Sequence, residues 1–260
     1  VVDGKAKNIV LVDADSINNN FYAPQEFTAE NIQYTREFKQ TTEKDVSRGW
    51  EGICLPFNVE TYTHESHGAI APFRNDASEY HFWLHQMTDQ GMQIATTIEA
   101  NKPYIISMPN NGSYPAAYNQ AGKVTFAAKN VRISESIPWA MILADGSIGI
   151  AGAYQSIAYG FYALNVGSEY EGYAEGSVFV NNYRAIRPFE VYGWHNGRDN
   201  EGAGARIISL SSLFGGNGTT GIIDVMNTNE LNGETWYDLN GRRLQSKPAR
   251  KGVYIKNGKK

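Results

Sequence analysis

The stretch EYHFWLHQM, residues 79–87, decides how this chain must be interpreted. Tyr80, Phe82 and Leu84 fall on one side of the alternation, whereas His81, Trp83 and His85 occupy the intervening set of positions. Alternation with a period of two is typical of a β-strand, while an α-helix would place residues four apart on one face. We therefore predict a β-strand with one buried face and one half-solvated face.

The histidine spacing also raises a metal hypothesis, because His64-x-x-His67 and His81-x-x-x-His85 could chelate an ion from a helix. In a strand, residues four apart lie roughly 13 Å from one another, which is too far for one ion. No Asp, Glu or Cys at a useful spacing strengthens the hypothesis. We expect no metal site, no cofactor and no catalytic residues.

Short apolar or alternating runs recur outward from this stretch, each bounded by Gly, Asn, Pro or Asp. The clearest are KNIVLVDA, WEGICLPFNVETY, KPYIISMP, GKVTFAAKNVRI, YGFYALNV, GSVFVNNYRAIRPFEVYGW and ARIISLSSL. Long helical periods are hard to find. The sequence predicts an all-β fold: an antiparallel β-sandwich, either one large or two associated sandwiches, plus a short C-terminal β-hairpin tail.

A Gly-, Asn- and Thr-rich segment, SLSSLFGGNGTTGIID, is the best candidate for a domain boundary. We expect a sandwich region over residues 1–220, with a subdivision near residue 135 left open, followed by a linker and β tail over 221–260. The G-x-G-x-x-G match at 216–221 lacks the strand and helix that a dinucleotide site needs, so we interpret it as compositional.

Composition excludes several classes of protein. The formal net charge of −4 and the absence of a basic stripe argue against nucleic acid binding. No apolar run approaches the roughly 20 residues that span a bilayer. The chain begins at Val1, so we expect its targeting segment to lie outside this sequence. The only cysteine, Cys54, sits in GICLPF and is expected to be a small buried hydrophobe.

Polar and aromatic clusters supply the candidate contacts. The loop GWHNGRDNEGAGAR carries Trp194, His195 and Arg198, which we take as the first place to look for ligand contacts, although Trp194 could instead cover the core. The stretch GSEYEGYAEGS is interpreted as a solvated hairpin. DADSINNN is interpreted as an Asx-rich turn, because it lacks the glycine and closing glutamate of a calcium loop.

The C-terminal stretch WYDLNGRRLQSKPARKGVYIKNGKK contains two Asn-Gly pairs, at Asn240 and Asn257. Asn-Gly tolerates the positive φ angles of a two-residue hairpin turn. Tail strands this short cannot be stable alone, so we expect them to need partners. Their basic side chains contrast with the acidic remainder of the chain.

YDLNGRRL…KGVYIKNGKK resembles the C-terminal sorting-type tails of secreted and surface proteins of the Bacteroidetes. FTAENIQYTREF, GWEGICLPFNV, ANKPYIISMP, AGAYQSIAYGFYAL and YRAIRPFEVY, in that order, resemble the sandwich that precedes such tails in adhesion-type proteins. The tail lacks the residues usually found after NGKK. The resemblance implies export, a secreted or outer-surface location, and contact with export machinery through the tail.

We therefore expect a non-enzymatic protein that binds a host or bacterial surface protein or glycan. One alternative is a carbohydrate-binding module or an accessory domain of a carbohydrate-active enzyme, in which two carboxylates would lie about 5–10 Å apart in a cleft. A second alternative is a structural spacer, which would have no concave aromatic patch.

Overall fold

The computed structural model describes residues 1–13, 19–38, 42, 48–110, 119–135, 137–195 and 207–214, and the backbone of three short strands beyond them. The chain divides into two compact units, Val1–Ile223 and Asp224–Lys260. The described part is almost entirely β, with one single-turn helix, α1 (Leu210–Leu213). The predicted all-β class is thus confirmed. None of the described helical residues forms a segment long and apolar enough to cross a membrane.

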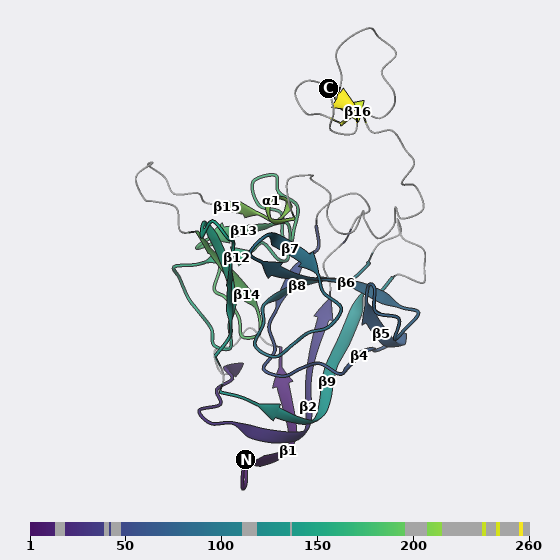
Figure 1. Cartoon of the computed structure of the whole chain (residues 1–260), viewed down its shortest axis with the longest axis vertical. Helices are drawn as coiled ribbons and strands as arrows, with labels where there is room; N and C mark the ends of the chain where they lie inside the picture. The colour runs from purple at the N-terminus through teal and green to yellow at the C-terminus, as the bar shows by residue number, and fades with distance from the viewer. Residues whose placement is uncertain are drawn as a thin grey trace. The chain divides into compact units, whose positions relative to one another are not determined.

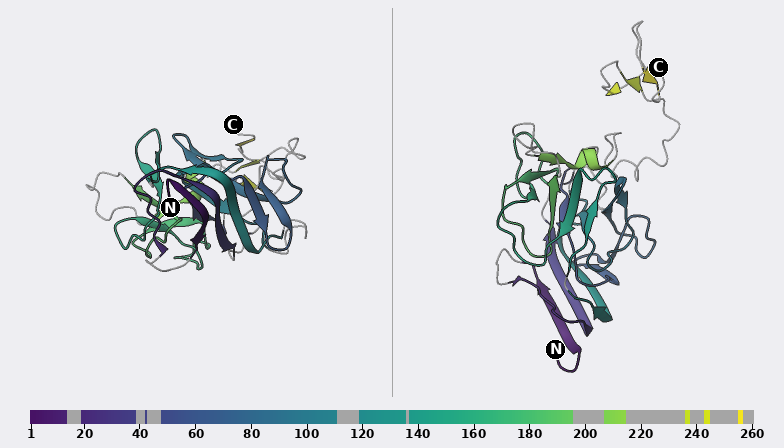
Figure 2. Two further views of the ribbon diagram at one scale, coloured as in Figure 1. Left: turned by 90° about the horizontal axis from the view of Figure 1, so that it is seen from below. Right: turned by 60° about the vertical axis from the view of Figure 1, so that its left-hand side comes forward.

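A strongly curled nine-stranded sheet forms one layer of the first unit, with β1, β2 and β9 side by side (Figures 1 and 2). In spatial order its strands are β1 (Lys5–Val12), β2 (Phe27–Phe38), β9 (Gly122–Ile133), β4 (Thr61–His64), β5 (Gly68–Pro72), β6 (His81–Thr88), β8 (Tyr104–Ser107) and β3 (Glu51–Ile53), with β7 (Gly91–Ile94) paired to β6.

The curled sheet is mixed, so the expectation of purely antiparallel pairing is wrong. β1 pairs with β2 in parallel, and so does β5 with β6. Parallel neighbours need a connection of about a dozen residues to return the chain to the same end of the sheet. Residues 13–26 provide that length between β1 and β2.

The second layer is a six-stranded sheet in which every pairing is antiparallel. Its spatial order is β10 (Ala140–Ile142), β11 (Ile148–Gly152), β14 (Val191–His195), β12 (Tyr162–Leu164), β13 (Val178–Asn181) and β15 (Ile207–Ser209). The start of the boundary segment SLSSLFGGNGTTGIID belongs to this unit, because Leu210 and Leu213 of α1 are buried.

In the second unit, β16 (Trp236–Tyr237) pairs antiparallel with β17 (Arg243–Leu244) and with β18 (Ile255–Lys256). The first pairing agrees with the hairpin predicted around Asn240 and Gly241, two residues that lie outside the described ones. The third strand was not expected. The tail strands pair with one another, and three strands form more backbone hydrogen bonds than a two-stranded hairpin.

Most of the stretch EYHFWLHQM lies in β6, so the prediction of a strand there is confirmed. The prediction that one face of this strand is half-solvated is wrong. Trp83 and His85 are buried along with the apolar face of the strand. His85 lies edge-on against Trp50, 5.2 Å between ring centroids, and against Phe214 at 5.0 Å. Phe214 follows α1, and this distant segment covers the face that periodicity alone assigned to solvent.

The two layers meet at closely packed backbone. A Cβ added to Gly52 of β3 would lie 2.7 Å from Cβ of Val191 in β14, so glycine is what allows these strands to approach. The Cys54 N–H donates to the Phe189 carbonyl at 3.1 Å. Phe189 has a φ of 67°, which is strained for a residue with a bulky side chain.

Cys54 is fully buried between the layers, which confirms that it behaves as a small core residue. A Cβ on Gly152 of β11 would lie 2.2 Å from its Sγ. Burial raises the pKa of the Cys54 thiol to about 12, so at neutral pH the thiol stays protonated and unreactive.

Candidate functional site

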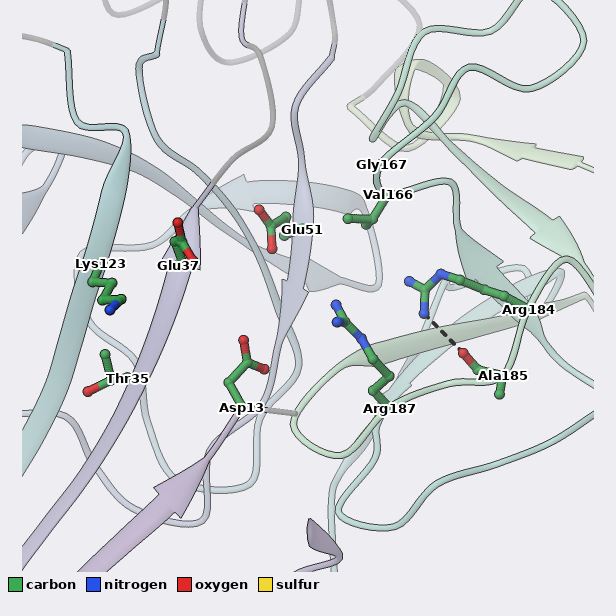
Figure 3. Close-up of a pocket in the computed structure, with 10 residues that line it drawn as sticks. All are labelled: Asp13, Thr35, Glu37, Glu51, Lys123, Val166, Gly167, Arg184, Ala185 and Arg187. Carbon is green, nitrogen blue, oxygen red and sulfur yellow. Dashed lines mark hydrogen bonds between the residues drawn. The ribbon is translucent and has the colours of Figure 1, made fainter. Parts of the chain in front are cut away.

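A charged cleft of about 740 Å³ opens where the curled sheet faces the loops of the second sheet (Figure 3). The curled sheet contributes Asp13, Thr35, Glu37, Glu51 and Lys123, and the facing loops contribute Val166, Gly167, Arg184, Ala185 and Arg187. One wall is therefore mainly acidic and the other mainly basic. No aromatic ring belongs to this described lining.

The acidic wall is organised by a buried cation beneath it. Arg36 of β2 is 2% exposed. Its Nε donates to the Tyr34 hydroxyl at 2.9 Å, and its Nη1 donates to the Gly52 carbonyl at 2.6 Å. The Tyr34 hydroxyl in turn donates to Asp13 at 2.6 Å. These contacts hold Asp13, directly after β1, against the floor of the cleft.

Arg36 connects the two layers to each other, and it also lies close to the acidic side chains of the cleft. Its Nη2 donates to the Phe189 carbonyl of the second layer, 3.3 Å away. Its nearest carboxylate oxygens lie at 3.6 Å on Asp13 and 3.8 Å on Glu51. Burial opposes the charged guanidinium, but Tyr34 and the nearby acids outweigh that effect and raise the pKa of Arg36. The buried cation therefore remains charged.

Glu51 is the exceptional acid of the cleft. Its side chain is 6% exposed, yet its carboxyl group makes no hydrogen bond with any described residue. Burial raises its pKa, Arg36 opposes the rise, and the value settles at about 7. Asp13 and Glu190 add to the rise, and Arg187 opposes it. A buried carboxyl that lines a cleft with a perturbed pKa marks a candidate functional site.

The basic wall is built on the buried Glu190. Arg184 donates to both Glu190 oxygens, at 2.7 and 3.2 Å, and its remaining N–H groups donate to the Leu164 and Ala185 carbonyls. Arg187 donates to Glu190 through Nε at 2.9 Å. Burial would raise the pKa of Glu190, but the two arginines outweigh it and lower the pKa to about 2.

Figure 3 shows the carboxylates of Asp13 and Glu51 and the guanidinium group of Arg187 converging on the same space. Because Arg184 uses all its N–H groups within the protein, its role is to position the wall. Arg187 reaches furthest toward the opposite wall (Figure 3). The arrangement places carboxylates on one side of the cleft and guanidinium groups on the other.

Tyrosines stand beside the cleft. The Ser168 and Tyr183 hydroxyls lie 2.5 Å apart, and their chain neighbours Gly167 and Arg184 line the cleft. Tyr170 packs edge-on against Tyr183, with ring centroids 5.4 Å apart. Tyr170 and Tyr173 lie in GSEYEGYAEGS, where they exchange two backbone hydrogen bonds, and together with Tyr183 we call them the tyrosine rim.

The residues singled out in the sequence lie elsewhere. Trp194 and His195 belong to β14 rather than to a loop, and neither lines the cleft. Trp194 is half-buried and lies directly over Gly149, its cross-strand neighbour in β11. His195 is exposed at the strand end. Arg198 lies outside the described residues.

The histidine pairs are used structurally. His64 and His67 stack at 4.6 Å between ring centroids. His64 Nδ1 accepts the backbone N–H groups of Ser66 and His67, while its Nε2 lies 3.1 Å from the Ala121 carbonyl and donates to it. No group of three or more His, Cys, Asp or Glu side chains within the described ranges is arranged to hold a metal ion.

Sequence reasoning missed the acids and bases of the cleft, although two signals were present. In FTAENIQYTREF, Arg36 falls in phase with the buried Ile32, Tyr34 and Phe38, so a charge occupies an apolar position. Glu51 is the only charged residue in the run WEGICLPF. Asp13 was noticed only as part of an Asx-rich turn.

Comparison of this chain with protein-family models, with curated proteins and with solved structures finds no match.

Proposed function

We propose that this chain is an exported bacterial surface or extracellular protein with a non-catalytic binding role, and that the charged cleft is its recognition site. In this proposal the two layers act as a β-sandwich that holds the cleft between them. The single observation that carries the proposal is the buried, hydrogen-bond-lacking carboxyl of Glu51 at the cleft floor. An acceptor that faces the cleft and that no described group uses suits a site where a ligand supplies the hydrogen-bond donor.

The rigidity of the surroundings supports binding. Buried hydrogen bonds connect the cleft walls to both sheets through Arg36, Phe189 and Glu190. The backbone of Phe189 is also held in a strained conformation there. A preorganised site loses little conformational entropy when it binds. Export and surface location rest on the resemblance of the tail sequence to sorting-type tails, and contact with export machinery is part of the same proposal.

Binding is tested with the full chain on immobilised panels of matrix proteins and polysaccharides, measured by biolayer interferometry. Glu37→Lys reverses a charge at the cleft edge, and Glu30→Lys makes the same change at an exposed position of the same strand. We expect binding that Glu37→Lys weakens at least tenfold and Glu30→Lys leaves within twofold. Binding that both variants retain equally would remove the cleft from the proposal.

A second candidate function, carbohydrate hydrolysis, is favoured by the raised pKa of Glu51, since a general acid must hold its proton near neutral pH. Asp13 would then be the second carboxylate. Incubation with polysaccharides and assay of reducing ends separates the two functions. Turnover that Glu51→Gln abolishes would replace the binding proposal with an enzyme.

A further inference from the structure

We propose that the cleft binds a neutral, hydroxyl-rich ligand, a saccharide, and that the Glu51 carboxylate accepts hydrogen bonds from its hydroxyl groups. This inference rests on the proposed binding function and names the ligand class for the same cleft.

The first step is the missing hydrogen-bond donor at Glu51. Its carboxyl group faces the cleft, and the ion-pair partner that the described residues give it is Arg36, at 3.8 Å, which is too long for a hydrogen bond. Asp13 beside it accepts the Tyr34 hydroxyl through one oxygen. A pair of adjacent hydroxyl groups supplies donors to such acceptors, as sugar diols do.

The second step is charge balance. Asp13 and Glu51 lie near Arg36, while Glu190 joins Arg184 and Arg187. Glu37 and Lys123 line the cleft from neighbouring strands, so acidic and basic side chains of the described lining and floor are equal in number. A cationic ligand would be repelled by Arg187 and by the buried charge of Arg36, and an anionic one by the carboxylates. A neutral ligand avoids both penalties and can donate and accept.

The third step is the tyrosine rim. Tyr173 is 42% exposed and exchanges two backbone hydrogen bonds with Tyr170, which packs against Tyr183. Tyrosine presents an apolar ring face and a polar hydroxyl at the same time, which suits the mixed C–H and O–H surface of a sugar. The cleft volume of about 740 Å³ accommodates an oligosaccharide of a few units.

Ligand binding is coupled to the proton on Glu51. The groups that face its carboxyl are Asp13 after β1, Arg36 on β2, and Arg187 and Glu190 from the second layer. A ligand that donates to the carboxylate prefers the ionised form, so its affinity falls when Glu51 is protonated. With a pKa of about 7, the affinity should drop about tenfold between pH 8 and pH 6.

The test is isothermal titration calorimetry of the full chain at pH 8. The probes are neutral gluco-, galacto-, manno- and xylotetraose, an oligogalacturonate and a glucosamine tetramer. At least one neutral probe should bind, and more tightly than both charged probes. Glu51→Gln should weaken that binding about tenfold, whereas Glu30→Gln, an exposed change on β2, should stay within twofold. The pH dependence should disappear in Glu51→Gln.

Thermal melts establish that Glu51→Gln folds; if it does not, the pH profile of the unmodified chain carries the test. Preferential binding of a charged probe, affinity unchanged by Glu51→Gln, or a flat pH profile would overturn the inference. Absence of saccharide binding, while protein ligands still bind in a Glu37-dependent manner, would overturn the ligand class and leave the proposed function standing. Absence of binding to every protein and saccharide probe would overturn both the ligand class and the proposed binding function.

Discussion

At the scale of single residues, Glu51 and His85 are buried titratable groups whose pKa values move in opposite directions. Burial raises the pKa of Glu51 to about 7 from its ordinary 4.5. Burial, helped by Arg74, lowers the pKa of His85 to about 3 from 6.5. Both shifts favour the uncharged form. Each group therefore gives the folded protein a pH dependence that the unfolded chain does not share.

The two dependences oppose each other between pH 4.5 and 6.5. There folded Glu51 keeps a proton that the unfolded chain has lost, so its effect lowers stability as pH rises. Folded His85 lacks a proton that the unfolded chain binds, so its effect raises stability as pH rises. The net slope of stability against pH from this pair is small. Relative to the unfolded chain, the folded chain holds one extra proton on Glu51 and one fewer on His85.

Replacing either group should reveal the slope of the other. Relative to the unmodified chain, Glu51→Gln should make the free energy of unfolding rise with pH in this window by up to about 1.4 kcal/mol per unit. His85→Leu should make it fall by a similar amount. Urea unfolding at several pH values measures both, with Glu30→Gln as the control. Profiles that match the unmodified chain would show that these shifts are absent.

Residue-scale prediction from sequence had a clear limit. Alternation identified β6 as a strand, and Cys54 was correctly placed inside. It could not say that Arg36 would meet Asp13, because the hydrogen-bonded partners of a buried charge come from other strands and from the second layer. The cleft is an assembly of such partners, so none of its roles follows from spacing.

At the scale of elements, β3 and β14 approach so closely that one side chain must be absent. Gly52 provides that space opposite Val191, and its carbonyl also accepts a hydrogen bond from Arg36. Strand β6 was predictable because its alternation is strong. The parallel pairing of β1 with β2 was not, because period-two sidedness is the same in parallel and antiparallel strands.

Gly52→Ala should destabilise the fold by about 1–3 kcal/mol, because the new methyl group would overlap both the side chain and the backbone nitrogen of Val191. Gly193→Ala is the matched control, since a Cβ there meets its nearest atoms at 3.6 Å, an ordinary contact. Denaturant unfolding compares the two variants. Equal stabilities would mean that the layers can separate at β3 without cost.

At the scale of the whole molecule, the described apolar core lies between Leu11 and Leu213, inside the first unit. The recurring short runs predicted a β-rich chain, and the Gly-, Asn- and Thr-rich segment predicted a boundary before the tail. These patterns could not specify the curl of the large sheet, which depends on how nine strands twist together. The loop between β13 and β14, which carries Arg184 and Arg187, also has no periodicity to interpret.

The chain shortened to residues 1–223 should fold and melt within about 2 °C of the full chain, because the removed strands are only two residues long and add no described core. Differential scanning calorimetry and circular dichroism check this expectation. A broad transition or a large drop in melting temperature would show that the second unit supports the first.

Because Cys54 is buried between the two layers, its chemical labelling can measure how often the layers separate. Its thiol is sealed between Gly152 and the adjoining layer, and it is the only sulfhydryl in the sequence. An alkylating reagent can reach it only after the two sheets part. The rate of labelling in native buffer therefore reports how often the molecule opens along the seam that contains the cleft.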